Sequence, residues 1–186
     1  CMAYNPLCLG LIPRDKDYLA FYKENREYFI DTESVAEVAV LRSYASLSYN
    51  NYSTHLSTML FEQTLIQAKI PFDIIFDEWL RKTKYKTLIL ANVESLSDEQ
   101  LDQIRNYVKN GRGLVATGET SYYDQWRRRR PNYGLADVFG VDPARTEVKE
   151  TIKNAYGRGR VVYIPRVIPS IEPERPGLSL MPRYRW

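Results

Sequence analysis

Two glutamates are the first residues whose type and placement could do chemistry. Glu94 follows an apolar run at residues 87–91, and Glu119 follows another at residues 114–117. If these runs are adjacent parallel strands, both glutamates lie on one rim, and glycoside hydrolysis uses two carboxylates roughly 5 to 10 Å apart. Most pairs of loop glutamates are solvated, however. We therefore expect a supporting role at this rim rather than catalysis, and predict no catalytic residue in this chain.

A run of four arginines is the sharpest surface feature of the sequence. The net charge is +3 and the run contributes +4, which leaves −1 for the rest of the chain. Affinity for a phosphate backbone grows with the number of cationic contacts, so one isolated run disfavours nucleic acid as a partner. We expect a loop that meets a partner subunit or a neighbouring domain, with a solvated loop as the alternative. The four residues are Arg127, Arg128, Arg129 and Arg130.

A third candidate surface is the stretch at residues 44–52, which is rich in tyrosine and small polar groups. Such side chains suit stacking on a sugar and hydrogen bonding to it at a cleft, and they serve a protein interface equally well. The candidates for carbohydrate or interface contacts here are Ser43, Tyr44, Tyr49 and Asn51.

The elements that would position these residues are best marked between residues 86 and 120. Ser97 and Gln100 have the spacing of a capping box, and Leu96 with Leu101 supplies the hydrophobic staple of a helix start. Gly111 is placed to take the left-handed conformation that ends the helix. The stretch therefore predicts a β-strand, a helix and a second parallel β-strand.

The same alternation extends over most of the chain and predicts the fold class. We expect an α/β protein with a flavodoxin-like open parallel sheet and helices on both faces. The domains are predicted at residues 1–30, 31–164 and 165–186, the last being a proline-rich extension or the start of a further domain. The predicted elements are helix 15–29, strand 35–41, loop 42–54, helix 55–69, strand 72–76, helical turn 135–139 ending at Gly140, and strand 160–164.

Composition limits the cofactors and partners. The only cysteines are Cys1 and Cys8 and there is one histidine, so a disulfide scaffold and a conventional cysteine-based zinc site are excluded. No apolar run approaches the roughly 18 residues that cross a bilayer. We expect no cofactor, no metal and no membrane partner.

Several segments in order resemble the β-galactosidase trimerisation domain of family-42 glycoside hydrolases. They are FYKENREYF, VAEVAVLRS, STHLSTMLFEQTLIQAKIPFDII, YKTLILANVESLSDEQLDQIRNYVKNGRGLVATGET, LADVFGV and YGRGRVVYIP, and they span about 145 residues. The resemblance implies a class I glutamine amidotransferase-like fold that follows a (β/α)8 catalytic barrel and contributes to subunit assembly. Residues 1–30 would then be the last strand and helix of that barrel.

The resemblance also identifies where an amidotransferase would carry its nucleophile. Active amidotransferases place a cysteine at a G-x-C-x-G elbow and activate it with a later histidine. Here residues 118–122 read GETSY, with Thr120 in place of the cysteine, and no histidine follows His55. Amidotransferase chemistry is therefore not expected. A Thr or Ser nucleophile paired with His55 is the formal alternative.

The sequence thus predicts a non-catalytic accessory domain of a glycoside hydrolase. Its expected partners are the catalytic barrel of the same polypeptide, further copies in a homo-oligomer for which the family name suggests three subunits, and carbohydrate at a shared cleft. Glu119 or Ser43 would support the barrel through hydrogen bonds. Two alternatives stay open: a stand-alone hydrolase using Glu94 and Glu119, and an anion- or nucleic-acid-binding module using the four arginines.

Overall fold

A computed structural model describes residues 15–141, 148–167, 170–171 and 184–185. The chain divides into two units, Cys1–Val35 and Ala36–Trp186, which we call the N-terminal unit and the sheet unit. The prediction for residues 1–14 lies outside the described residues. No helix among the described residues has the length and apolar character that a membrane span requires.

The N-terminal unit holds α1 (Asp15–Glu24) and the 3₁₀ turn η2 (Arg26–Tyr28). The predicted single helix over residues 15–29 is therefore shorter than expected. The backbone N–H of Asn25 makes the last i→i−4 bond of the helix, to the carbonyl of Phe21, and the Asn25 side-chain amide donates to the same carbonyl, a local bond of the kind that favours helix ends. The Phe29 ring packs on Phe21 and Tyr22, with centroid distances of 6.2 and 5.5 Å.

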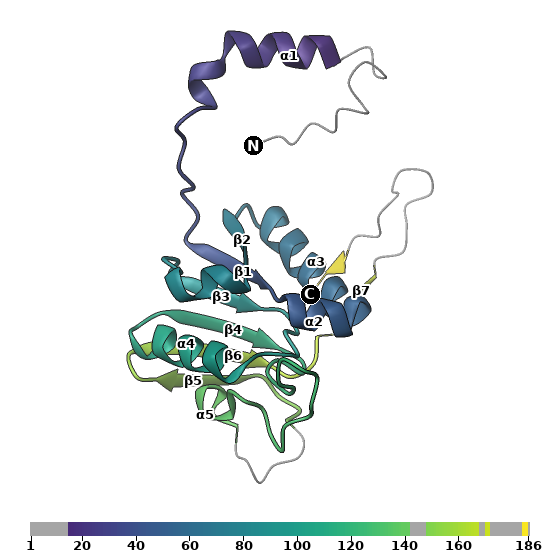
Figure 1. Ribbon diagram of the computed structural model, residues 1–186, viewed down its shortest axis with the longest axis vertical. Helices are drawn as coiled ribbons and strands as arrows, with labels where there is room; N and C mark the ends of the chain where they lie inside the picture. Colours follow the sequence, from purple (N-terminus) through teal and green to yellow (C-terminus); the bar gives the residue numbers. More distant parts are fainter. Residues whose placement is uncertain (1–14, 142–147, 168–169, 172–183, 186) are drawn as a thin grey trace. The chain divides into compact units, whose positions relative to one another are not determined.

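The sheet unit is built on six strands in the order β2-β1-β3-β4-β6-β5 (Figure 1). All neighbouring pairs are parallel except β5 with β6. The order of the first four strands is that of flavodoxin-like sheets, so the predicted fold class is confirmed. The bounds are β1 (Val38–Arg42), β2 (Phe72–Phe76), β3 (Thr87–Leu90), β4 (Gly113–Thr117), β5 (Ile152–Tyr156) and β6 (Gly159–Ile164). A separate antiparallel pair is formed by β7 (Ser170–Ile171) and β8 (Tyr184–Arg185).

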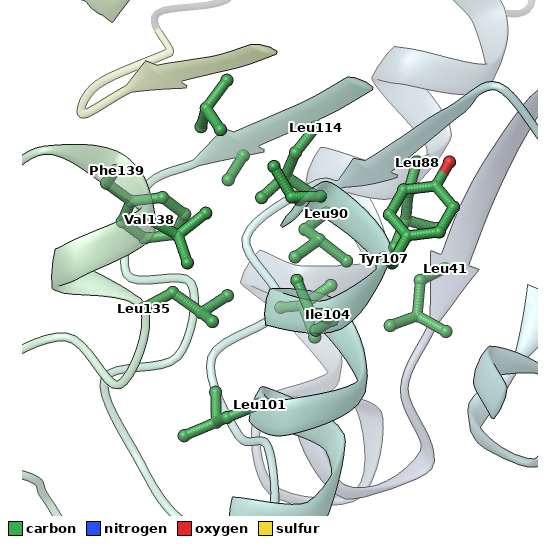
Figure 2. Close-up of a cluster of buried hydrophobic side chains, with 14 of the residues drawn as sticks. Leu41, Leu88, Leu90, Leu101, Ile104, Tyr107, Leu114, Leu135, Val138 and Phe139 are labelled. Carbon is green, nitrogen blue, oxygen red and sulfur yellow. The ribbon is translucent and has the colours of Figure 1, made fainter. Parts of the chain in front are cut away.

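Helices cover both faces of this sheet. On one face α4 (Asp98–Lys109) packs on β3 and β4, as Figure 2 shows for Ile104 with Leu90 and Leu114. On the same face α5 (Ala136–Phe139) packs on β5 and β6. On the other face α3 (Asn51–Gln67) packs through Leu65 on Val40 and Ile89. The remaining helical segments are α2 (Tyr44–Tyr49) and the 3₁₀ segment η3 (Asp77–Lys82).

The local signals at the ends of the helices are confirmed. The Ser97 hydroxyl accepts from the Gln100 N–H, and the Gln100 side chain accepts from the Ser97 N–H, which completes the capping box. Gly111 has φ of 100°, the positive value that was expected of it, and Gly140, where the predicted helical turn ends, also has positive φ, 72°. These contacts span only a few residues, which is why the sequence predicts them.

The structure differs from the predicted elements at two further places. The loop predicted over residues 42–54 is largely helical, because its small polar residues act as caps: Ser43 caps α2 and Asn50 caps α3. Strand β5 was missed because Lys153, Asn154 and Ala155 are weak strand formers. It forms by antiparallel pairing with β6 across the turn at Gly157, so the predicted parallel sheet has one antiparallel edge strand.

Candidate functional site

The polar residues that the sheet unit buries gather around the carboxyl ends of β1, β3 and β4. This is the edge where open α/β sheets place their ligands, so we describe it as the candidate site. Each buried polar group needs a hydrogen-bond partner, and here the partners come largely from the chain itself. The set is Ser43, Ser46, Thr54, Thr58, Asn92, Glu94, Ser95, Thr117, Thr120 and Ser121.

Asn92 joins the loop after β3 to the loop after β4. Its N–H donates to Thr117 Oγ1 at 3.1 Å, and its side-chain oxygen accepts from the Glu119 N–H at 2.9 Å. A Cβ added to Gly118 would lie 2.4 Å from that oxygen, so the loop can approach only because residue 118 is glycine. Asn92 has φ of 52°, a conformation that asparagine tolerates better than most residues.

Glu94 is locked into this network. Its side chain is 2% exposed, and Oε1 accepts from the side-chain amides of Asn50 at 2.8 Å and Asn92 at 3.0 Å. Oε2 accepts from the guanidinium of Arg127. Both carboxylate oxygens are thus engaged, and this charge is balanced inside the protein.

Glu119 has a different environment, because its side chain is exposed while its N–H is held by Asn92. The two glutamates do follow adjacent strands, as predicted. One carboxylate is buried and paired and the other is exposed. An acid and base pair would need Glu94 to leave its three hydrogen-bond donors. The supporting role expected for Glu119 stays a prediction.

The turn that resembles the amidotransferase elbow is buried. Thr120 is fully buried; its hydroxyl lies 2.6 Å from the Thr117 carbonyl and 3.1 Å from that of Leu90, and it accepts from the Val93 N–H. Ser121 is also buried and its hydroxyl accepts from the Leu135 N–H. Neither of these contacts involves His55, which lies half-buried on α3. The hydroxyls of Thr120 and Ser121 are hydrogen-bonded to backbone groups and are therefore poor candidates for a nucleophile.

The four arginines belong to an ordered hairpin, residues 122–130, which we call the arginine hairpin. Tyr123 and Arg129 form an antiparallel bridge across it, and Tyr123 also bridges to Ser95 in parallel. The Arg130 N–H donates to the Tyr122 carbonyl at 2.9 Å. At the turn, Asp124 Oδ1 accepts from the N–H groups of Trp126 and Arg128.

The four guanidinium groups have different partners. Arg127 pairs with Glu94 and lies 4.4 Å over the Tyr123 ring. Arg130 pairs with Asp98 at 2.6 Å and donates to the Leu96 carbonyl. Arg129 stacks on Tyr122 and is exposed, and Arg128 is exposed and forms no ion pair with a described residue. Arg127 and Arg130 therefore hold the hairpin to the rest of the sheet unit through ion pairs, whereas Arg128 and Arg129 are exposed cations.

The residues predicted from the stretch at 44–52 do not share one surface role. Ser43 is fully buried and donates to the Ser95 carbonyl at 3.3 Å, so its hydroxyl serves the fold. Tyr44 stacks on Phe76 with a centroid distance of 5.1 Å. Tyr49 and Asn51 are exposed near the junction of α2 and α3. A role for the three exposed residues in binding carbohydrate or a partner stays a prediction.

Asp77, Asp124 and Tyr163 near this edge have shifted pKa values. Desolvation raises the pKa of Asp77, although its Oδ2 accepts from the Tyr44 N–H at 2.7 Å. Desolvation opposes ionisation of Asp124 as well, but the N–H groups of Arg128 and Trp126 outweigh it and hold the pKa of Asp124 below its usual value. Burial strongly raises the pKa of Tyr163, whose hydroxyl donates to the Gly118 carbonyl.

Sequence reasoning missed the two asparagines that organise the site. Asn50 was placed in a loop and Asn92 was not singled out, yet both donate to Glu94. A signal for Asn92 was present, because an asparagine directly after a buried strand favours the left-handed conformation. Within the described ranges, no group of three or more histidine, cysteine, aspartate or glutamate side chains could hold a metal ion.

The fold and this edge define a class of protein. It is an α/β domain with a flavodoxin-like sheet, and the buried polar groups at the carboxyl edge of that sheet are hydrogen-bonded largely to other groups of the same chain. No family model matches the chain, and no relative was found among curated proteins.

The structural neighbours of the chain are GH42 β-galactosidases and other glycoside hydrolases. A catalytic mutant of Gan42B, a GH42 β-galactosidase from G. stearothermophilus, gives a TM-score of 0.65 at 18% identity, covering 75% of this chain and 28% of that one. The β-galactosidase from Bacillus circulans sp. alkalophilus gives 0.63 at 13%, covering 75% and 30%. The exo-β-1,4-mannosidase Op5Man5 from Opitutaceae bacterium strain TAV5 gives 0.57 at 10%, covering 81% and 34%.

The chain therefore spans about a third or less of the length of these neighbours. At these identities the similarity establishes the fold, which recurs as part of longer glycoside hydrolases.

Proposed function

We propose that this chain is a non-catalytic accessory domain of a larger glycoside hydrolase of the β-galactosidase type, and that it acts in subunit assembly. The observation that carries the proposal is the state of Glu94. This carboxylate stands where hydrolysis would need a free acid or base, and it is buried and bonded to three side chains. The structural neighbours support the link to glycoside hydrolases.

The N-terminal unit fits the same proposal. Its helix α1 and the residues just after that helix carry aromatic side chains that are exposed in this chain, and such a surface is expected to be covered by a partner. We propose that residues 1–30 are the tail of a catalytic barrel, which would cover them. The exposed aromatic residues are Tyr18, Phe21, Tyr22, Tyr28 and Phe29.

A contribution to a carbohydrate cleft is a secondary part of this proposal. Tyr44 is 51% exposed with its ring supported from behind by Phe76, the arrangement in which an aromatic face can receive a sugar. Glu119, also at the carboxyl edge, has an exposed carboxylate that could accept from a hydroxyl group. The sugar would be held there and the reaction would occur on residues of the barrel.

The two alternative functions each have less support. A stand-alone hydrolase would need Glu94 to break its pairing with Arg127. An anion-binding module would have two exposed guanidinium groups, Arg128 and Arg129, since Arg127 and Arg130 are paired with Glu94 and Asp98. Two cations give little phosphate affinity at moderate salt.

The proposal is tested by assaying the purified chain on aryl β-galactosides, together with Glu119→Gln and Glu94→Gln. We expect no turnover above the buffer rate for any of the three proteins. Turnover by the parent chain that disappears in Glu119→Gln would overturn the proposal and favour the stand-alone hydrolase.

A further inference from the structure

The edge of the sheet opposite the candidate site carries a group of cations that the proposed function does not explain. Glu94 and Glu119 follow the carboxyl ends of β3 and β4, whereas three segments that meet at the amino-terminal edge hold seven basic residues and no acidic one. The segments are residues 84–86, 107–113 and 153–160. We call this surface the basic edge, and its seven cations are Lys84, Lys86, Lys109, Arg112, Lys153, Arg158 and Arg160.

The fold brings these three segments together. The Gly113 N–H donates to the Lys86 carbonyl at 2.8 Å, and the Arg158 N–H donates to the Lys109 carbonyl at 3.1 Å. In the register of β4 with β6, Arg160 lies opposite Gly113. Because the cations come from distant parts of the chain, a sequence whose charge outside the arginine run is close to zero gives no sign of this surface.

Most of the cations on the basic edge have no counter-charge. Lys86 pairs with Glu37, and the other six form no ion pair with a described residue. Five of those six are exposed and Arg112 is half-buried. Like charges that are held close together repel one another, so this surface has an unbalanced positive field that favours anions. In the arginine hairpin, by contrast, two of the four guanidinium groups are paired.

The cations form a row rather than a single point. Arg160 of β6 lies opposite Ala155 of β5, and Lys153 lies two residues along β5. Residues in this diagonal relation share one face of the sheet, with their Cα atoms about 7 to 8 Å apart. Lys153, Ala155 and Arg160 are all exposed. A ligand with several anionic groups along its length can therefore bind more than one of these cations at once.

The chemistry of the basic edge fits a polyanion that is held by charge alone. A guanidinium group binds a carboxylate through two parallel N–H groups, and it can bind two oxygens of a sulfate in the same way. Single-stranded nucleic acid also needs aromatic faces on which its bases stack. Tyr107 is 9% exposed, and Tyr85 and Tyr156 are half-buried, so none of them presents an open face. These observations favour a charged polymer without bases.

We propose that the basic edge binds a polysaccharide that carries carboxylate or sulfate groups. The exposed cations of the row, Lys109, Lys153, Arg158 and Arg160, hold its anionic groups. The inference rests on the proposed function, because a glycoside hydrolase gains from an accessory domain that holds it on a polymer. The site is separate from the carboxyl edge, where Tyr44 and Glu119 lie.

The test is a calorimetric titration of the full chain with polygalacturonate, which carries carboxylates, and with dextran sulfate. The parent chain should bind at least one of them and should not bind neutral dextran, and the polymer that binds identifies the anionic group. Raising the salt from about 50 mM to about 200 mM should weaken binding at least about tenfold, because several cationic contacts are lost. Arg158→Gln with Arg160→Gln should also weaken binding at least about tenfold.

Two further variants separate a specific site from general charge. Arg128→Gln with Arg129→Gln removes the same charge from the arginine hairpin and should bind within about twofold of the parent, since exposed charges beyond a Debye length are screened. Arg158→Lys with Arg160→Lys keeps the charge of the basic edge and should bind within about threefold of the parent. Thermal melting of each variant checks that the fold is kept.

The other outcomes overturn the inference. A parent chain that binds neither acidic polymer has no such site, and the galactoside assay then decides the proposed function separately. Equal loss of binding in the basic-edge and hairpin glutamine variants would show a response to net charge without a site. Tighter binding to a DNA duplex than to either polysaccharide, lost in the basic-edge variant, would assign the surface to nucleic acid.

Discussion

The carboxylate of Glu94 and the guanidinium of Arg127 form an ion pair between residues 33 positions apart in the sequence. The pair joins the loop after β3 to the arginine hairpin. Because each group is bonded to the other, neither is free to react with a ligand. A residue that looks catalytic by its place on the rim thus serves to order a surface loop. The following predictions test this network and its neighbours.

Replacing Glu94 by glutamine should destabilise the chain by about 2 kcal/mol, because it leaves the Arg127 guanidinium without its counter-charge in a largely buried setting. Glu119→Gln is the matched control and should change the free energy of unfolding by less than about 0.5 kcal/mol, since its carboxylate is exposed. Urea unfolding of both variants measures the difference. Equal values would contradict the structural role of Glu94.

Replacing Thr120 by valine should cost about 1 to 3 kcal/mol, because the Val93 N–H loses its acceptor while staying buried. Thr120→Ser keeps the hydroxyl and should recover most of that loss. If the two variants unfolded at the same urea concentration, the hydroxyl would have no part in stability.

Replacing Gly118 by alanine should be more damaging than replacing Gly111 by alanine. Both glycines have positive φ, 59° and 100°, so both substitutions strain the backbone by about 1 kcal/mol or more. Only at Gly118 does the added Cβ also meet a neighbour, Asn92 Oδ1 at 2.4 Å, whereas at Gly111 the nearest atom is 3.7 Å away.

The measurement is the difference in melting temperature between the two glycine variants. A Gly111→Ala variant at least as unstable as Gly118→Ala would show that the approach of Asn92 to the loop is not a tight one.

The pH dependence of stability should change in opposite directions when Asp77 and Asp137 are replaced by asparagine. Desolvation raises the pKa of Asp77, so the folded state holds its proton longer than the unfolded state, and stability falls as pH rises from the ordinary value of 3.8. In the parent, unfolding in this pH range releases the proton of Asp77. Asp77→Asn has no such proton to release. Its stability relative to the parent should therefore increase between pH 3 and pH 7.

Asp137 has the reverse sign. Desolvation works against its ionisation, but hydrogen bonding to Arg105 prevails and lowers its pKa. Its contribution to stability is present above the ordinary pKa of 3.8 and is lost as pH falls through the lowered value. Asp137→Asn should lose stability relative to the parent as pH rises from 3 to 5. Slopes of the same sign for the two variants in urea titrations would refute the assignment.

The candidate site was only partly predictable from the sequence. The placement of Glu94 and Glu119 after adjacent strands follows from the strand and helix pattern, and the parallel pairing of β3 with β4 bears it out. The burial of Glu94 could not be predicted in the same way. It depends on Asn50 and Arg127, which lie 44 and 33 positions away and reach it only when the sheet assembles.

The arginine run was likewise predictable only in part from the sequence. Its charge and its flanking aromatics are properties of the sequence, and they mark a surface feature. Which arginines are anchors and which are exposed depends on the bridge between Tyr123 and Arg129 and on carboxylates from the neighbouring loop and from α4.

The sequence by itself determined the features made by contacts within a few residues: the capping box at Ser97, the left-handed glycine at 111, the end of a helical turn at Gly140, and the strand and helix alternation that specifies a flavodoxin-like sheet. The tertiary structure decided the edge strand β5, the helical conformation of residues 44–49 and the engagement of Glu94 and Thr120 in the fold. The physical reason is that strand pairing and the burial of polar groups depend on partners distant in sequence, whose free energy appears only after the chain has folded.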